Sequence, residues 1–202
     1  MPSDDVRPPS REPARPDPAT ERGALRRHLL ALRATLPWRP GADAAIEAAL
    51  ATLLDRLPVH RLGFYWPIQQ EFDARAVVSR WLAGAPARQA ALPLVSRPGV
   101  PLDFHLWEPA TPMVAGHYGI PVPDGTPPLL PDVLLIPCVG FSPEKFRLGY
   151  GGGFYDRTLA ALAAAGSTPL AIGIGYEACR IALAPQPHDL PMDWMVSEAG
   201  AF

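Results

Sequence analysis

A glycine-rich stretch late in the chain constrains its fold more than any other feature. Four glycines fall within the five positions 149–153, and the stretch runs on into Phe154-Tyr155-Asp156-Arg157. The apolar run 132–137 precedes it, and a helical pattern of apolar residues begins directly after it. A buried strand, a glycine loop and a helix N-terminus in this order form an anion-binding arrangement, because the backbone N–H groups can turn inward without obstruction from Cβ atoms.

Charged side chains around the loop favour a phosphate ligand. Arg147 and Arg157 bracket the glycines, and Asp156 supplies a carboxylate that could hold a phosphate-bound Mg²⁺ ion. A flexible turn that only caps a helix is the alternative, but linkers rarely carry aromatic residues such as Tyr150. The stretch is neither a P-loop, which needs Gly-Lys-Ser/Thr, nor a dinucleotide fingerprint, since it comes late in the chain and no acidic residue ends a following strand.

Apolar runs and helical patterns alternate along the chain, which predicts a single three-layer α/β domain with a mainly parallel sheet. The domain is expected over residues 20–202, after a proline-rich tail (1–19) that is predicted to be disordered. Thr20 is the expected N-cap of the first helix and Asp73 that of a later one. Strands are expected at 61–66, 89–95, 102–107, 132–137 and 169–176, and helices at 20–36, 43–57, after 73 and after 153.

Composition sets ordinary bounds on function. A chain of 202 residues with 48% apolar content can bury one core, and a net charge of −2 gives no reason to expect nucleic acid or a membrane as a partner. The two cysteines lack zinc-binding spacing. No apolar run approaches the ~20 residues that span a bilayer, and the N-terminus lacks the apolar core of a signal peptide. A cytoplasmic location is therefore expected.

Two further groups of charged residues need an interpretation. Glu71 follows the predicted strand 61–66, at the carboxyl end where open α/β sheets bind ligands. The first helix has a leucine stripe at 25, 29, 32 and 36, and its arginines are expected on solvated faces. These arginines are Arg22, Arg26, Arg27 and Arg33.

The string RLGYGGGFYDRTL, residues 147–159, resembles the signature of the 5-formyltetrahydrofolate cyclo-ligase family, also called methenyltetrahydrofolate synthetases. The resemblance spans roughly Glu21 to Glu198 and rests on several separated pieces in the family's order. Arg22 with Leu25-Arg26 is similar to the family's opening basic pattern, and residues 118–123 are similar to its Phe-Gly-Ile-x-Glu-Pro. Residues 188–198 resemble its closing His-Asp segment.

This resemblance implies a fold and a reaction. The fold would be a Rossmann-like sheet related to the ribose-isomerase and coenzyme A-transferase group. The reaction would be the cyclisation of 5-formyltetrahydrofolate to 5,10-methenyltetrahydrofolate with ATP and Mg²⁺, through a phosphorylated formyl group, with release of ADP and phosphate. The partners would be reduced folate and ATP, and the protein is expected to be a monomer.

The resemblance also implies site residues. Arg147 and Tyr155 would be catalytic, and Asp156 and Asp189 would hold Mg²⁺, with Asp193 as the second choice because it could be only a turn residue. Glu71 would contact the pterin ring, and the other substrate contacts would be Gly151, Gly152, Gly153 and Tyr155. The nucleotide would contact Arg22, Arg26, Arg147, Gly149, Tyr150, Gly151, Gly152, Gly153, Phe154 and Tyr155.

Three positions depart from the family pattern. Val122 replaces a Glu, Ser142 replaces an Asp, and Phe146 stands at the family glycine. These departures leave open a divergent paralogue that acts on another substrate, and a non-enzymatic module that binds a phosphorylated metabolite is a second alternative. Phe104 or Trp107 could stack on a pterin, although a core or rim position is the simpler interpretation of both.

Overall fold

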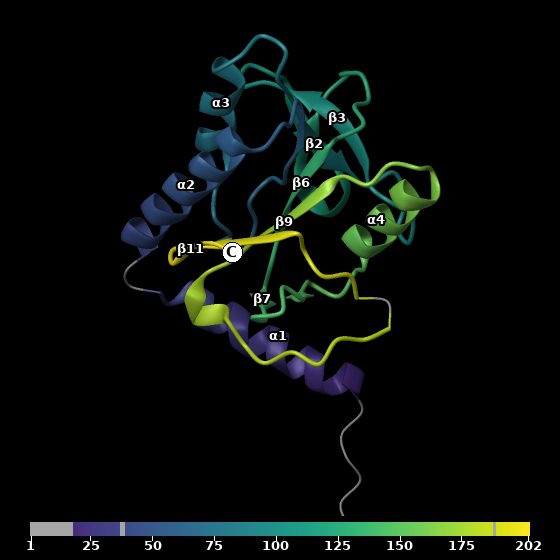
Figure 1. Ribbon diagram of the computed structural model, residues 1–202. Helices are drawn as coiled ribbons and strands as arrows, with labels where there is room; N and C mark the ends of the chain where they lie inside the picture. The colour runs from purple at the N-terminus through teal and green to yellow at the C-terminus, as the bar shows by residue number, and fades with distance from the viewer. Residues whose placement is uncertain (1–17, 37–38, 188) are drawn as a thin grey trace, which may run out of the picture.

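The structure is a computed structural model that describes residues 18–36, 39–187 and 189–202. Its largest element is a seven-stranded sheet of order β11-β10-β9-β6-β1-β2-β3 (Figure 1). Neighbouring strands from β10 to β2 are parallel, whereas the edge strands β3 and β11 are antiparallel to their neighbours. The strands are β1 (Arg61–Gly63), β2 (Gln89–Leu94), β3 (Asp103–Trp107), β6 (Val133–Pro137), β9 (Leu170–Ile174), β10 (Trp194–Ser197) and β11 (Gly200–Ala201).

Helices cover both faces of this sheet. The helices α2 (Arg39–Arg56) and α3 (Arg75–Ala83) pack on one face, and α4 (Phe154–Ala164) packs on the other (Figure 1). A parallel sheet needs this double cover because its strands are apolar on both sides. The predicted three-layer α/β fold with a mainly parallel sheet is confirmed.

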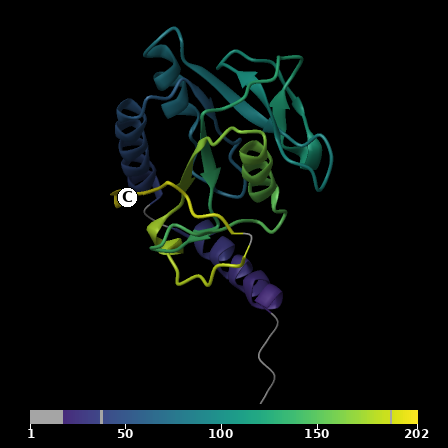
Figure 2. The same cartoon turned by 45° about the vertical axis from the view of Figure 1, so that its right-hand side comes forward.

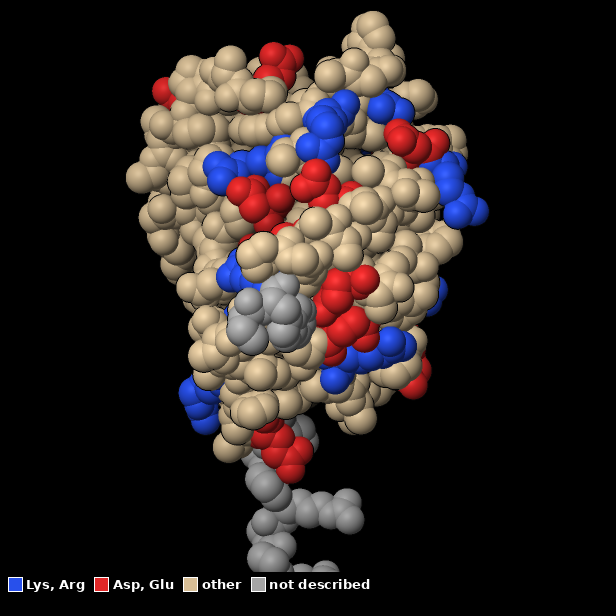
Figure 3. Space-filling model, turned by 90° about the vertical axis from the view of Figure 1, so that its left-hand side faces the viewer, with Lys and Arg blue, Asp and Glu red and all other residues tan. Residues whose placement is uncertain are grey.

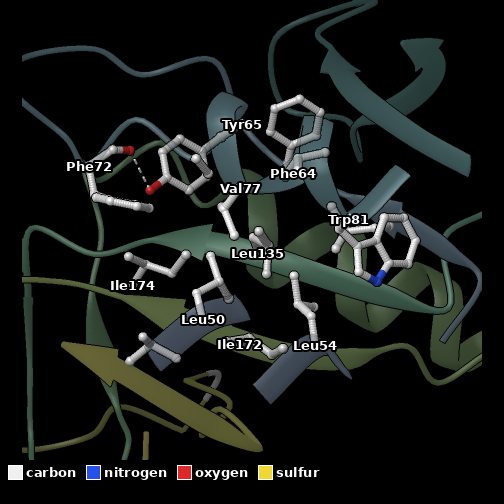
Figure 4. Close-up of a cluster of buried hydrophobic side chains, with 14 of the residues drawn as sticks. Leu50, Leu54, Phe64, Tyr65, Phe72, Val77, Trp81, Leu135, Ile172 and Ile174 are labelled. Atoms are coloured by element: carbon white, nitrogen blue, oxygen red, sulfur yellow. Dashed lines mark hydrogen bonds between the residues drawn. The ribbon is translucent and has the colours of Figure 1, made fainter. Parts of the chain in front are cut away.

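The central strand β6 shows how the two cores are separated. Leu135 packs with residues of α2 and α3, such as Leu50 and Trp81, in the cluster drawn in Figure 4. Leu134 and Ile136 point to the opposite face and pack in the cluster that includes α4. This alternation follows from the two-residue period of a strand.

One helix lies outside the two layers. Helix α1 (Pro18–Ala34) crosses the end of the sheet, where Leu29 packs with Val139, Leu148 and Cys179. Figure 2 shows it below the strands, and shows the short β4–β5 ribbon beside the β2–β3 edge, where β5 contacts both strands. The remaining short elements are β4 (Met113–Ala115), η1 (His117–Gly119), β5 (Pro121–Pro123), β7 (Gly140–Phe141), β8 (Arg147–Leu148) and η2 (Glu177–Cys179).

Several predicted boundaries are wrong. Helix α1 begins at Pro18, so Thr20 lies inside it; a proline suits the first turn because that turn needs no N–H donor. The N-cap of α3 is Ala74, although Asp73 still accepts the N–H of Arg75 at 3.0 Å. Helix α2 begins four residues before the predicted start at residue 43, and β1 ends at Gly63 and not at residue 66. The predicted disordered tail lies outside the described residues, apart from the two residues that open α1.

The surface over α2 and α3 has mixed charge. Basic and acidic side chains lie next to one another on the face shown in Figure 3, and neither sign forms a continuous patch there. Ion pairs such as Arg88 with Asp55 (3.6 Å) belong to this pattern. Among the described residues, no helix combines the length and the apolar character that crossing a membrane requires.

Candidate active site

A cavity of about 730 Å³ opens at the carboxyl ends of the parallel strands. Its walls include Tyr65 and Trp66 after β1, Val95 after β2 and Pro137 at the end of β6. The chain passes from β1 to β2 through α3 and from β6 to β9 through α4, on opposite faces of the sheet. The cavity therefore lies where the strand order reverses, which is the usual ligand site of such sheets.

The glycine loop forms one wall of this cavity, between β8 and α4. Gly151 (φ 98°) and Gly153 (φ 64°) adopt left-handed backbone conformations that disfavour any residue with a Cβ atom. Within the described part of the chain, none of the N–H groups of residues 149–153 has a hydrogen-bond acceptor. Together with the first N–H groups of α4, they supply a set of unused donors.

Arginines hold the loop through its carbonyl groups. Arg26 Nε donates to the Gly149 carbonyl at 2.7 Å, and Arg157 Nη2 donates to the Gly152 carbonyl at 2.7 Å. The Arg157 guanidinium also lies over the Phe154 ring, at 5.2 Å from its centroid. These bonds engage two carbonyl groups of the loop and leave its N–H groups available.

The two aspartates predicted to bind Mg²⁺ both line the cavity, and each is paired with an arginine. Asp156 Oδ1 lies 2.5 Å from Arg147 Nη2, and Asp189 Oδ2 lies 2.5 Å from Arg22 Nη2. Asp193, the second choice for the metal, does not line the cavity; it accepts the backbone N–H of Ala171 at 2.7 Å.

This donor set fits a magnesium ion that arrives with its substrate. Mg²⁺ is commonly held by one or two carboxylates together with phosphate oxygens and water. Within residues 18–36, 39–187 and 189–202, no group of three or more His, Cys, Asp or Glu side chains could hold a metal ion alone. Asp156 and Asp189 line the same cavity, so two carboxylates are present for such a site, which phosphate oxygens would have to complete.

Glu71 lines the cavity with a carboxylate that is almost fully buried (5% exposed). Its Oε1 accepts the Tyr150 hydroxyl at 2.6 Å, and its Oε2 accepts the Ile68 N–H at 2.8 Å. Burial raises the pKa of the Glu71 carboxyl, and the hydrogen bonds from Tyr150 and Ile68 and the charge of Arg33 counteract part of that shift. The two preceding residues, Gln69 (φ 45°) and Gln70 (φ 58°), have left-handed backbones that turn the chain here.

Arg33 is buried, although the sequence predicts an exposed position for it. It was expected on a solvated face, yet it is only 2% exposed, and it donates to Tyr150 as well as to two backbone carbonyls. Its position at i+11 from Arg22 and i+7 from Arg26 puts all three on one helix face. This spacing is the feature of the sequence that groups Arg33 with the two predicted phosphate-binding arginines.

Comparisons with known proteins agree with this geometry. A sequence model described as the 5-formyltetrahydrofolate cyclo-ligase family matches residues 18–198. The chain belongs to the 5-formyltetrahydrofolate cyclo-ligase family. A 5-formyltetrahydrofolate cyclo-ligase from Haemophilus influenzae is 28% identical over 185 residues, covering 86% of this chain and 91% of that protein. One from Mycolicibacterium smegmatis is 35% identical over 100 residues, covering 46% of this chain and 49% of that protein.

Solved structures of 5,10-methenyltetrahydrofolate synthetases share the fold. The structure from Aquifex aeolicus gives a TM-score of 0.71 at 24% identity, with 89% of this chain and 91% of that chain covered. The structure from Mycoplasma pneumoniae gives 0.69 at 24% identity, with 88% and 99% covered. The prediction that the chain is an enzyme of a ligase family is confirmed by the family match and by the names of its relatives.

The departures from the cyclo-ligase pattern fall in different places. Val122 is buried and lines the cavity as an apolar wall. Ser142 and Phe146 lie outside the cavity lining, in the turn between β7 and β8. The left-handed residue of that turn is Lys145 (φ 66°), so Lys145, and not Phe146, takes the conformation that a glycine favours.

The two aromatic residues considered for pterin stacking belong to the cores. Neither lines the cavity; Trp107 packs edge-on against Phe64, with ring centroids 5.0 Å apart, and Phe104 packs in the cluster that includes α4. The expected long connection after β6 contains the short hairpin of β7 and β8, which places Arg147 at the cavity. His188, which opens the closing segment that resembles the family, lies outside the described residues.

Proposed function

We propose that this cyclo-ligase family member uses ATP and Mg²⁺ to convert 5-formyltetrahydrofolate to 5,10-methenyltetrahydrofolate, with release of ADP and phosphate. One observation carries the proposal: two sets of groups line a single cavity. The first set, here called the phosphate end, consists of unused backbone donors and arginines, and the second, called the Glu71 end, consists of a buried carboxylate and apolar side chains. The first end suits a polyphosphate, and the second suits a heterocycle with N–H donors.

At the phosphate end, the N–H groups of residues 149–153 and of the first turn of α4 would bind the phosphoryl oxygens. Arg22, Arg26 and Arg147 would supply positive charge, and Tyr150, Phe154 and Tyr155 would contact the nucleotide from the same loop. Asp156 and Asp189 would hold Mg²⁺, which neutralises charge on the transferred phosphoryl group when it is bound. Arg147 and Asp156 lie within ion-pair distance, so Arg147 would contact the phosphate whose Mg²⁺ ion Asp156 would hold.

At the Glu71 end, the carboxylate of Glu71 would accept hydrogen bonds from the 2-aminopyrimidinone edge of the pterin. Each oxygen of the carboxylate keeps a lone pair beside the one used by Tyr150 or Ile68. Trp66, Ile68 and Val122 would cover the ring faces with apolar surface.

The chemistry then needs positioning and charge neutralisation but no protein nucleophile. The formyl oxygen attacks the γ-phosphorus and ADP leaves, which gives an imidate phosphate. N10 of the folate attacks the former formyl carbon and loses its proton, and the C–O bond breaks to release phosphate. Arg147 would neutralise charge on the phosphoryl group in both steps. Burial raises the pKa of the Tyr155 hydroxyl, so this group stays protonated and can act only as a hydrogen-bond donor or acceptor, not as a base.

The first test is to follow the absorbance band of the methenyl product with purified protein, 5-formyltetrahydrofolate, ATP and Mg²⁺. We expect ATP-dependent product formation that is lost in Asp156→Asn and strongly reduced in Glu71→Gln. The exposed Asp124 and Glu108 offer matched controls, Asp124→Asn and Glu108→Gln, which should behave like the wild type.

Two other results would contradict the proposal. Turnover of other formylated amines, but not of the folate, would identify a divergent paralogue. Ligand binding that needs no ATP and is indifferent to Asp156→Asn would identify a binding module. The monomeric state and the cytoplasmic location stay predictions, which gel filtration and cell fractionation can check.

A further inference from the structure

The buried guanidinium of Arg33 donates to one group in each of three segments, which follow β1, β6 and β8. Nε donates to the Gln69 carbonyl at 3.1 Å, after β1, and Nη1 donates to the Cys138 carbonyl at 3.3 Å, after β6. Nη2 donates to the Tyr150 hydroxyl at 2.6 Å, in the glycine loop. None of the ion pairs among the described residues includes Arg33, so this buried charge has no direct carboxylate partner.

The nearest acidic group lies one hydrogen bond further away. Arginine has donors only, so the Tyr150 oxygen must accept from Arg33, and the single hydroxyl proton is directed to Glu71 Oε1 at 2.6 Å. The direction of both bonds is thereby set without reference to any ligand. The hydroxyl group carries the attraction between a buried cation and a buried carboxylate, both at most 5% exposed.

Tyr150 also belongs to the phosphate end of the cavity. It lies between Gly149, whose carbonyl is held by Arg26, and Gly151, whose left-handed backbone shapes the loop. Any ligand that orders the glycine loop therefore also fixes the hydroxyl group that holds Glu71. The reverse also holds, because a ligand that orders Glu71 fixes Tyr150.

We propose that Arg33 is a positioning residue that acts through the Tyr150 hydroxyl to hold Glu71 in place and to couple it to the glycine loop. Nucleotide and folate then bind cooperatively, since each ligand orders groups that the other needs. This inference rests on the proposed function and adds a contact that couples the two ligands. Arg33 touches neither ligand in this scheme; it acts only through Tyr150 and the loop carbonyls.

The test measures the affinity for 5-formyltetrahydrofolate with and without a non-hydrolysable ATP analogue and Mg²⁺, by tryptophan fluorescence or calorimetry. In the wild type, the analogue should tighten folate binding by about tenfold, a typical coupling between two sites. Tyr150→Phe removes only the hydroxyl and should bring this factor close to one. Arg33→Met should do the same, and it should weaken folate binding alone by about tenfold, the usual effect of losing a charge-assisted hydrogen bond.

The double variant gives a sharper criterion. If both residues act through one contact, Arg33→Met combined with Tyr150→Phe should be no worse than the more severe single variant. The control is Arg27→Met, which removes an exposed arginine of the same helix and should leave the coupling factor unchanged. Thermal melts of all variants separate loss of folding from loss of coupling, and Tyr150→Phe carries the test if Arg33→Met does not fold.

The outcomes separate this inference from the proposed function. A wild type that makes product and shows coupling, while Tyr150→Phe keeps the coupling in full, would overturn the role of Arg33 and leave the cyclo-ligase reaction intact. Additive losses in the double variant would also overturn it. A wild type that neither binds nor converts the folate would overturn the proposed function, and this inference with it.

Discussion

The two ends of the cavity handle charge in opposite ways. At the glycine loop, the carboxylates of Asp156 and Asp189 are each paired with an arginine at 2.5 Å, and the charges balance locally. At the Glu71 end, the carboxylate is buried, and its hydrogen-bond partners among the described residues are neutral groups, the Tyr150 hydroxyl and the Ile68 N–H. A paired charge can exchange its partner for an incoming phosphate or metal ion, whereas a desolvated carboxylate strongly favours a ligand that brings N–H donors. The phosphate end therefore suits a charged ligand, and the Glu71 end selects a ligand that has N–H donors.

The difference between the two ends should be largest when the affinity of each variant is measured for each of the two ligands. We expect Asp156→Asn to weaken MgATP binding by about 100-fold and Glu71→Gln to weaken folate binding by about 100-fold, since each removes a charged hydrogen-bond partner. Each variant should change the affinity for the other ligand, measured alone, by less than about threefold. Calorimetric titrations with single ligands check this, and parallel losses of both ligands in either variant would mean that the two ends are not separate.

Asp189 and Asp193 allow a comparison of a cavity carboxylate with a structural one. We expect Asp189→Asn to raise the Mg²⁺ concentration needed for ATP binding by about tenfold. It should also lower the melting temperature, because Asp189 pairs with Arg22 and accepts the Gln186 N–H. Asp193→Ala should leave that concentration unchanged and destabilise the fold by about 1–3 kcal/mol, because the buried Ala171 N–H loses its acceptor. Magnesium titrations and thermal melts of both variants test this. A higher Mg²⁺ requirement in Asp193→Ala, with none in Asp189→Asn, would contradict the assignment of Asp189 to the Mg²⁺ site.

The glycines of the loop should differ among themselves. Gly151→Ala should destabilise the protein by about 1–2 kcal/mol, because its φ of 98° strains any residue with a Cβ atom. Gly149→Ala should cost less than about 0.5 kcal/mol, since an added Cβ there meets nothing within 4 Å. Urea denaturation compares the two, and equal losses would contradict the backbone argument.

A smaller effect should appear as pH dependence at the Glu71 end. Burial raises the pKa of Glu71 above 4.5, and only the ionised form can accept both N–H groups of a pterin. Folate affinity should therefore fall as pH decreases through the raised pKa of Glu71, and this dependence should vanish in Glu71→Gln. The groups that face Glu71 are Arg33, Arg39, Tyr65, Cys138, Tyr150 and Tyr155.

The sign for stability is the reverse of the sign for binding. Between the unfolded pKa of Glu71 and its raised folded pKa, the folded protein binds more protons than the unfolded chain. The contribution of Glu71 to the free energy of unfolding should thus decrease as pH rises through that window. Denaturation of the wild type and Glu71→Gln at several pH values measures it, and a contribution that increases with pH would contradict the burial argument.

The smallest effect concerns the thiols. Burial raises the pKa of Cys138 to about 12, and Cys179 is buried as well. Neither should react with a thiol reagent in the native protein near pH 8, whereas both should react after unfolding. Rapid labelling of the native protein would show that the core around the end of β6 opens readily.

Local pattern was enough to predict much of this protein. The glycine loop between an apolar strand and a helix needs only neighbouring residues to be recognised, and so does the alternation that predicted the α/β fold. Glu71 could be predicted because the carboxyl end of a strand has a known place in an open sheet. The structure places both at the cavity, because each inference rests on residues that are neighbours in the chain or on a strand end with a fixed place in the sheet.

Other features depended on contacts between residues far apart in the sequence. The spacing of Arg22, Arg26 and Arg33 puts them on one helix face, but it cannot tell whether that face meets water or protein. Only the packing of α1 against loops 36 to 117 residues away turned Arg33 from an expected surface residue into a buried one. Likewise, the sequence ranks Asp189 before Asp193 only through the family resemblance, and the folded chain places Asp189 at the cavity and Asp193 outside its lining. Periodicity determines which side chains share a face, whereas desolvation and pairing are decided by what that face packs against.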